Sequence, residues 1–225
     1  MTALARTVVV AEMQARDLLR RRAVMVLFVL LPAAFYYSVP ADEPWSVVAA
    51  SMGVSWAVAA AGVFGILGWR RADPRLALVG APALQGLLGR LLLLQALALI
   101  LVALFAPQVL WRSSALLAEP GLLVLAFVLL AVVSVPLGMA IGALVPREME
   151  GTLVLIGVLG IGMSVPPDTV AAQALPTWGP IEILYAAADL SDASVGAGFA
   201  HALASTAVLL ALAAWSWRRR TRISH

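Results

Sequence analysis

The sequence predicts an all-α membrane protein with six transmembrane helices, an N-terminal helix at the membrane interface and both termini in the cytoplasm. Its composition is the first reason: 63% of the 225 residues are hydrophobic, 12% are charged, and the mean hydropathy is +0.99. Soluble domains are about half apolar and about a quarter charged. A soluble domain of this length has too high a surface-to-volume ratio to bury so many apolar side chains. The chain is therefore expected to lie in a lipid bilayer.

The six predicted spans are the stretches that are apolar enough to cross the hydrocarbon core. A transmembrane helix needs about 20 mainly apolar residues to cross about 30 Å. The stretches that meet or approach this length are residues 23–39, 46–68, 91–110, 121–145, 152–165 and 200–217, of which the fifth is the shortest. The chain is thus expected to consist of an interfacial helix over 1–22 and a transmembrane domain over 23–225.

The arginines predict the orientation of these spans. All 15 basic residues are arginine; 14 fall on one side of the predicted spans and Arg112 alone falls on the other. The positive-inside rule places the arginine-rich side, with both termini, in the cytoplasm. The isoelectric point of about 10.2 then indicates contact with anionic lipid and not with nucleic acid. Five tryptophans fall at predicted span ends, as an interfacial aromatic belt requires: Trp45, Trp69, Trp111, Trp215 and Trp217. We expect a multi-pass protein of the cytoplasmic (inner) membrane.

Residues 1–22 are too polar to cross the membrane but have the period of an amphipathic helix. One predicted face is apolar, with Leu4, Val8, Ala11, Ala15, Leu18 and Leu19, and the other carries Arg6, Glu12, Arg16 and Arg20. Such a helix lies in the membrane interface with its arginines near lipid phosphates. A basic tail that only sets the topology is the alternative, and we favour the interfacial helix.

The segment between the second and third spans, residues 69–90, contains a short predicted helix. Asp73 is a good N-cap and Pro74 a good first helical residue. Leu76, Leu78 and Val79 form an apolar patch, and Gly80 and Pro82 end the helix. The patch is expected either to fold against the bundle or to be presented to another protein, and spacing alone does not separate the two.

The segment 166–198, on the side opposite the termini, is expected to be partly buried. Prolines divide it into short apolar pieces over 170–175 and 181–188. Such pieces favour short re-entrant helices that cover one end of the bundle over a plain surface loop, because broken backbone is allowed at membrane depth where protein buries it.

The sequence offers little catalytic or metal chemistry. It has no cysteine and no lysine, so thiolate ligands, Schiff-base lysines and the P-loop lysine are excluded. Its two histidines, His201 and His225, are too few for a three-histidine zinc site and give no serine a credible base. No catalytic, cofactor-binding or metal-binding residue is therefore predicted, and the chain is not expected to be an enzyme.

Few residues inside the predicted spans are polar. No span has a charged residue in its middle, which argues against a proton- or ion-coupled pump. Gln95 is the candidate for a substrate pathway, although an interhelical hydrogen bond is the more ordinary role of such a residue. Glu182 and His201 are expected to be solvated near the headgroups. Close helix packing is expected at Gly138-x-x-x-Gly142 and along Gly157, Gly160 and Gly162, and helix kinks at Pro32, Pro107 and Pro136.

The order of these features resembles the membrane subunits of type-2 ABC exporters over most of the chain. Residues 1–22 are similar to the family's N-terminal elbow helix, and 69–90 to its coupling segment between spans two and three. The matching motifs are Leu76-Ala77-Leu78-Val79-Gly80-Ala81-Pro82 with Leu87-Leu88-Gly89-Arg90, then Gly138-Met139-Ala140-Ile141-Gly142 with Pro146-Arg147-Glu148, and Pro166-Pro167 with Leu175-Pro176-Thr177-Trp178. Two motifs depart from the family pattern: Arg70-Arg71-Ala72-Asp73-Pro74-Arg75 replaces a more acidic run, and Met163-Ser164-Val165-Pro166 replaces a Ser-Gly ending of span five.

The resemblance implies a division of labour between subunits. ATP and Mg²⁺ would be bound by a separate ATP-binding subunit, and none by this chain. The coupling residues would be Asp73, Pro74, Arg75, Leu76, Leu78, Val79 and Pro82, and the outer re-entrant residues Pro166, Pro167, Pro176, Trp178 and Pro180. A second permease chain, identical or different, would complete the transporter. The uncharged spans favour export of a lipophilic or amphipathic substrate, such as a drug, an antibiotic or a lipid-like molecule.

Three other functions are weighed against this one. A haem-export permease has a similar size and number of spans, but its distinctive loop sequence is not found. A membrane-embedded structural or regulatory subunit would transport nothing, and a partner ATPase would distinguish it from an exporter. An intramembrane enzyme is the weakest alternative, because acid–base residues are missing from the spans.

Overall fold

Every regular element in the described part of the chain is helical. The computed structural model describes residues 3–20, 22–69, 83–165, 168–190 and 193–222. Its elements, in chain order, are α1 (Ala3–Arg20), α2 (Arg22–Tyr37), α3 (Trp45–Leu67), α5 (Ala83–Arg112), the 3₁₀ turn η1 (Ser114–Leu116), α6 (Pro120–Leu144), α7 (Glu148–Ser164), α8 (Val170–Gln173), α9 (Trp178–Ala187) and α10 (Val195–Arg222).

Four described helices are long and apolar enough to cross a membrane. They are Trp45–Leu67, Gln85–Arg112, Pro120–Leu144 and Val195–Arg219. Helices α2 and α7 lie where the other two spans are predicted but have only 16 and 17 residues. At 1.5 Å per residue they are about 25 Å long, somewhat less than the 30 Å hydrocarbon core. The all-helical fold is thus confirmed, with four helices able to cross a membrane.

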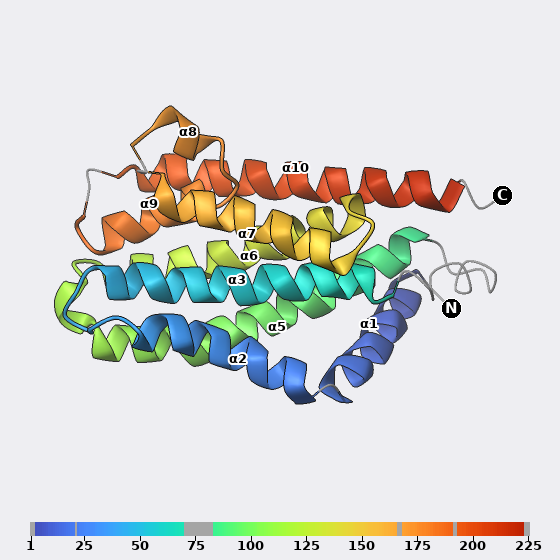
Figure 1. Ribbon diagram of the computed structural model, residues 1–225, viewed down its shortest axis with the longest axis horizontal. Coiled ribbons are helices and arrows are strands. Elements are labelled where there is room, and N and C mark those ends of the chain that lie inside the picture. The colour runs from blue at the N-terminus through green and yellow to red at the C-terminus, as the bar shows by residue number, and fades with distance from the viewer. Residues whose placement is uncertain (1–2, 21, 70–82, 166–167, 191–192, 223–225) are drawn as a thin grey trace.

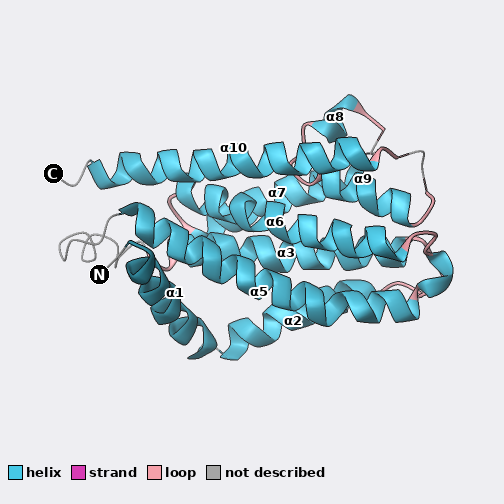
Figure 2. Cartoon of the chain, turned by 180° about the vertical axis from the view of Figure 1, so that it is seen from behind, coloured by secondary structure: helices cyan, strands magenta, loops and turns pink. Residues whose placement is uncertain are grey.

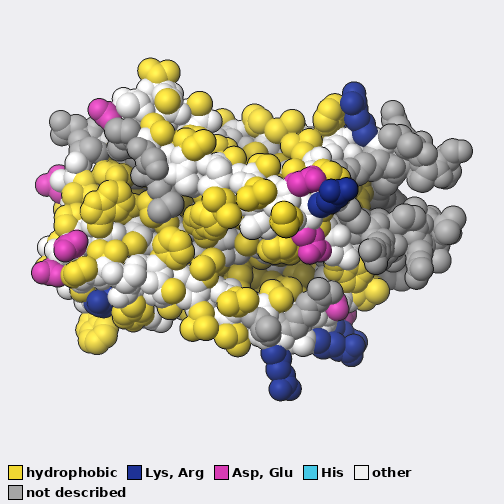
Figure 3. Space-filling view, viewed as in Figure 1, with side chains coloured by type: hydrophobic (Ala, Val, Ile, Leu, Met, Phe, Trp, Pro, Cys, Tyr) yellow, Lys and Arg dark blue, Asp and Glu magenta, His cyan; other side chains and the backbone are white. Residues whose placement is uncertain are grey.

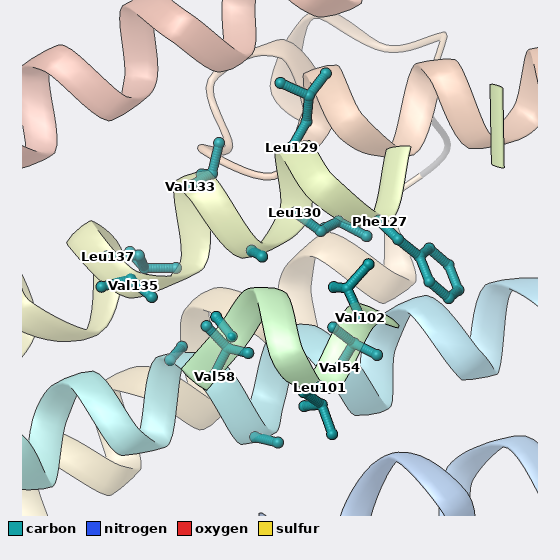
Figure 4. Packing of buried hydrophobic residues seen from close by; sticks show 14 of the residues in the cluster. Val54, Val58, Leu101, Val102, Phe127, Leu129, Leu130, Val133, Val135 and Leu137 are labelled. Carbon is teal, nitrogen blue, oxygen red and sulfur yellow. The ribbon is translucent and has the colours of Figure 1, made fainter. Parts of the chain in front are cut away.

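The helix bundle is built around α3 and α6 (Figure 1). In α3 and α6, 78% and 72% of the residues in the most apolar 18-residue stretch are buried inside the protein. The corresponding shares are 39% in α5 and 17% in α10. Helix α6 touches α3, α5, α7, α9 and α10. Figure 4 shows its core side chains, such as Phe127 and Leu130, facing Val54 of α3 and Val102 of α5. A helix buried all round needs apolar residues all round, which α6 has.

Small residues let α3 and α6 approach closely. A Cβ atom added at Gly62 would lie 2.9 Å from the carbonyl oxygen of Val135, and one added at Gly142 would lie 2.8 Å from that of Val63. One added at Gly138 would collide with the carbonyl group of Ala59. The close packing expected at Gly138-x-x-x-Gly142 is therefore present. The same expectation is wrong for Gly157 and Gly160, since a Cβ atom at either would meet nothing within 4 Å.

The two ends of the bundle differ in charge. The start of α1 and the end of α10 lie at the same end, and the α2–α3, α5–α6 and α9–α10 connections lie at the other (Figure 1). Acidic side chains gather at this second end, at the left of Figure 3, and include Asp42, Glu43, Glu119 and Asp189. Among the described arginines only Arg112 lies there. This separation of charge is the arrangement that the arginine pattern predicts.

Helix α1 lies obliquely across the bundle and packs on α5 (Figures 1 and 2). A helix is present where the interfacial helix is expected, and part of its predicted apolar face is exposed. Thr7 and Gln14 are buried, whereas Val8 and Leu19 are exposed. The reason lies in α5: Gly89 has no side chain, so the carbonyl oxygen of Thr7 approaches its backbone, which turns this side of α1 inward.

Helices α8 and α9 occupy the segment that is expected to be partly buried. Ile183, Leu184 and Ala187 of α9 are fully buried against α6 and α10. The carbonyl of Ala187 accepts hydrogen bonds from the amides of Ala118 and Glu119, which join the end of α9 to the loop before α6. Asp189 follows with a positive φ of 51°, a left-handed conformation that often terminates helices. The expected partial burial is thus observed, while the re-entrant depth remains a prediction.

Candidate functional site

An apolar cavity of about 490 Å³ lies between α1, α2, α3 and α5. Its volume falls in the range of about 300 to 1,000 Å³ that is typical of small-molecule sites. Most of its lining is aliphatic or aromatic: Leu27, Phe28, Leu30, Leu31, Phe64, Leu93, Leu94 and Leu97. In Figure 3 a hollow floored by hydrophobic side chains lies on the face that carries α2 and α3. Two smaller pockets nearer the other end of the bundle have volumes of only about 30 and 20 Å³.

The cavity exists because α2 and α5 meet at one end and separate toward the other. Near the acidic end Tyr36 of α2 packs edge-on against Phe105 of α5, with ring centroids 5.6 Å apart. Close by, the backbone of Pro32 approaches Gly53 of α3, where an added Cβ atom would lie 2.6 Å from the proline Cα. Toward α1 the two helices diverge, and the face of α3 between them carries small residues: Ala57, Ala60, Ala61, Gly65 and Gly68. Small side chains leave this space unfilled.

A hydrogen-bonded cluster holds the helices together at the closed end. The hydroxyl of Tyr36 lies 3.0 Å from that of Ser113, which lies 3.3 Å from that of Ser46. The Arg112 guanidinium stands over the rings of Tyr36 and Tyr37, at 4.9 and 4.7 Å from their centroids. These contacts join α2, α3 and α5 at the end of the molecule remote from α1.

The polar groups of the cavity are concentrated at the end near α1. Gln14 and Asp17 of α1 and Arg90 of α5 line this end. Gln14 is only 4% exposed, and its Nε2 has no hydrogen-bond partner among the described residues. A buried amide donor of this kind costs free energy until an acceptor satisfies it. The cavity therefore has an apolar body and one polar end.

Arg90 is held in place by aromatic side chains. It is 1% exposed, and its guanidinium lies 4.6 Å from the ring centroid of Trp217 on α10 and 6.0 Å from that of Trp69. Cation–π contacts at these distances are favourable and strengthen when the cation is desolvated. The sequence analysis placed Arg90 in the loop before the third span, but α5 begins at Ala83 and includes it. Packing against α1 accompanies the helix in this stretch, which the apolar span alone does not predict.

Trp217 also differs from its predicted role. Three of the predicted belt tryptophans, Trp45, Trp111 and Trp215, are largely exposed, as an aromatic belt requires. Trp217 is 7% exposed and packs on Arg90 inside the bundle. Trp215 and Trp217 are separated by a single serine, and nothing in this local sequence indicates that one is exposed and the other buried. The burial of Trp217 depends on the position of α5, which carries Arg90.

His201 is not a solvated headgroup-level residue. Its Nε2 lies 2.9 Å from the carbonyl oxygen of Gln173, and its ring packs edge-on against Trp178 with a centroid distance of 5.0 Å. It therefore joins α10 to α8 and α9. Trp178 and Pro176 are half-buried, and Pro180 is buried within α9. Pro166 and Pro167 lie outside the described residues.

The remaining predicted site residues fall into two groups. The coupling residues Asp73, Pro74, Arg75, Leu76, Leu78, Val79 and Pro82 all lie outside the described residues. Gln95 is described but does not line the cavity, to which α5 contributes Leu93, Leu94 and Leu97. Its Nε2 is buried and makes no hydrogen bond within the described chain, so the expected interhelical bond is not observed there.

Comparison with known proteins adds no relative. No protein-family model matches the chain, and no curated protein sequence matches it either. The described residues contain no group of three or more His, Asp or Glu side chains placed to hold a metal ion. The arrangement suits the binding of an apolar or amphipathic molecule.

Proposed function

We propose that this chain is the membrane-spanning subunit of an ATP-driven exporter of the type-2 ABC class, and that it moves a lipophilic or amphipathic substrate out of the cytoplasm. The observation that carries the proposal is the apolar cavity, which has its polar end beside α1 at the arginine-rich end of the bundle. A substrate with an apolar body and a polar group would find both environments there. ATP hydrolysis and its Mg²⁺ would belong to a separate subunit.

The path of the chain supports six spans. Besides the four long apolar helices, α2 and α7 run along the bundle between its two ends (Figure 1). With both termini at one end, an even number of crossings is required. Tilting of neighbours or local thinning of the bilayer accommodates helices that are a few ångströms short, at modest cost. The arginine-rich end would face the cytoplasm of a cell whose inner membrane holds the protein.

The position of α1 supports its role as an elbow helix. It lies obliquely at the arginine-rich end and exposes Val8, Val9 and Met13 beside the Glu12–Arg16 ion pair. Apolar and charged groups on one exposed surface suit a helix at the boundary of headgroups and acyl chains. The coupling segment would follow α3 at this same end and contact the ATP-binding subunit.

The decisive experiment is purification of the tagged chain in mild detergent together with its natural partners. We expect a stoichiometric soluble ATPase and a second permease chain, identical or different, to co-purify. The double variant Leu76→Asp/Leu78→Asp should reduce the recovered ATPase at least tenfold, because burying a carboxylate in a protein groove is unfavourable. Leu190→Asp, an exposed loop leucine at the opposite end, is the matched control and should retain the partner.

One result would contradict the exporter proposal, and another would contradict only the coupling assignment. If the chain purifies without a nucleotide-hydrolysing partner, the structural or regulatory subunit becomes the leading function. If the Leu76→Asp/Leu78→Asp variant retains full ATPase binding and transport, the coupling assignment is wrong even where the exporter assignment holds.

A further inference from the structure

We propose that the cavity between α1, α2, α3 and α5 is a binding site for a single-chain lipid with an uncharged headgroup, which enters from the bilayer. The site needs only this chain, so it stands independently of any ATPase partner. Four observations carry the proposal: the shape of the cavity, the buried donor at its end, the charge of that end, and its open side.

The apolar part of the cavity is long and narrow. Along α2 its lining extends from Val24 to Ala34, and along α3 from Ala57 to Gly68. Ten or eleven helical steps correspond to about 15 Å. A volume of about 490 Å³ spread over this length suits an extended hydrocarbon chain lying parallel to the helices.

The polar end offers a hydrogen-bond donor to a headgroup. Gln14 Nε2 is buried and makes no hydrogen bond within the described residues, although the amide lines the cavity. Buried polar groups in native proteins are nearly always satisfied. An ester or hydroxyl oxygen of a headgroup at this position would accept the missing hydrogen bond.

The charges at this end favour a neutral headgroup. Arg90 contributes one positive charge and Asp17 one negative charge, and both line the cavity beside Gln14. The guanidinium is also occupied on one face by the ring of Trp217. Because these two lining charges balance, a strongly anionic headgroup in the cavity gains little Coulomb energy to offset its desolvation. A glycerol or similar neutral group accepts the hydrogen bond of Gln14 at no such cost.

The cavity opens sideways toward lipid. Val24, Leu27 and Leu30 of α2 line it and are also 42%, 64% and 54% exposed at the surface of the bundle. Apolar side chains shared between a cavity and an apolar surface form a route that a hydrocarbon chain enters without crossing water. The polar end lies beside α1, the helix that we propose lies at the membrane interface.

The test is photolabelling of the purified full chain in lipid nanodiscs with monoolein that carries a diazirine in its acyl chain. Peptide mapping should find label on cavity residues such as Phe28, Leu31 and Leu94, and excess unlabelled monoolein should reduce that label at least fivefold. Ala61→Phe, which fills the cavity, should reduce it about tenfold. Gln14→Leu should reduce competition by monoolein about fivefold, as expected for one hydrogen bond.

Matched controls separate this site from general exposure to lipid. Gln95→Leu on α5 removes a buried amide that, unlike that of Gln14, does not line the cavity. This variant should be labelled and competed as the wild type is. Ala60→Leu is a milder filling variant, used if Ala61→Phe does not yield a folded monodisperse protein. Equal label on exposed Val208 of α10, or full cavity label in both filling variants, would overturn the proposal. Oleate competing more strongly than monoolein at neutral pH would overturn the neutral headgroup.

Discussion

Two faces of α3 carry similar small residues, but one packs tightly against α6 and the other borders the cavity. One face, with Ser55, Ala59 and Gly62, packs against Ser134, Gly138 and Gly142 of α6, and we call this contact the α3–α6 seam. The other face, with Ala57, Ala60 and Ala61, borders the cavity. Both faces are rich in small residues. In the seam the small residues allow two backbones to touch, whereas beside the cavity they leave space.

The comparison shows that small residues in a transmembrane helix have two distinct consequences. Interfaces between transmembrane helices are enriched in small residues because close approach increases van der Waals contact. The same residues produce a cavity where the neighbouring helices are held apart. In this chain α2 and α5 are held together near Tyr36 and Phe105 and separate toward α1. The position of the neighbour, and not the size of the residue, separates seam from cavity.

The largest expected difference between the faces comes from adding the same side chain to each. Ala59→Leu places three more carbons in the seam, where Ala59 is fully buried, and should lower the free energy of unfolding by about 3 kcal/mol. Ala61→Leu, two residues away, should change it by less than about 0.5 kcal/mol or raise it slightly, because the side chain enters the cavity. The free energies of unfolding of both variants can be measured in mixed micelles by raising the fraction of a denaturing detergent. Equal losses would remove the distinction between the faces.

A smaller effect is expected from one methyl group in the seam. Gly138→Ala should cost about 2 kcal/mol, because the added Cβ atom meets the backbone of Ala59 and the two helices must move apart. Gly157→Ala on α7 is the control, since its Cβ atom meets nothing within 4 Å. It should cost nothing and gain up to about 1 kcal/mol of helix propensity. Thermal unfolding in detergent distinguishes them; a stable Gly138→Ala would mean that the seam is looser than described.

The smallest expected effect is that of a single hydrogen bond across the seam. The hydroxyls of Ser55 and Ser134 lie 2.8 Å apart and are both buried. Ser134→Ala should cost about 0.6 kcal/mol, the average for such bonds between membrane helices. A double-mutant cycle with Ser55→Ala isolates the pair, and the double variant should lose little more than either single variant. Additive losses would show that the hydroxyls act separately.

Much of the fold was predictable from local sequence. The apolar stretches locate α3 and α6 to within one residue at each end, because hydropathy over about 20 residues depends only on the residues themselves. Helix α10 extends beyond its predicted span at both ends, since its exposed final turns are polar but still helical. The start of α5 was mispredicted because the residues before the third apolar stretch carry no local helix signal, whereas α1 packs on α5 there, with the carbonyl oxygen of Thr7 and the side chain of Val10 close to Gly89.

The candidate site was much less predictable. The amphipathic pattern of residues 1–22 assigns no role to Gln14. The side of α1 that turns inward is set by the close approach of Thr7 to Gly89, which has no side chain. The pairing of Arg90 with Trp217 joins residues that are far apart in sequence and unremarkable in their local contexts. Gln95, the most conspicuous polar residue within a span, does not line the cavity.

By itself the sequence determined that this protein is built of helices, that several of them are long and apolar enough to cross a membrane, and that its arginines lie between the apolar stretches. These properties are sums over neighbouring residues, so they hold however the helices pack. Only the tertiary structure decided which small-residue face of α3 closes and which stays open, which side of α1 turns inward, and that a buried arginine stacks on the last tryptophan. Each of these depends on the distance between segments that the chain itself keeps far apart.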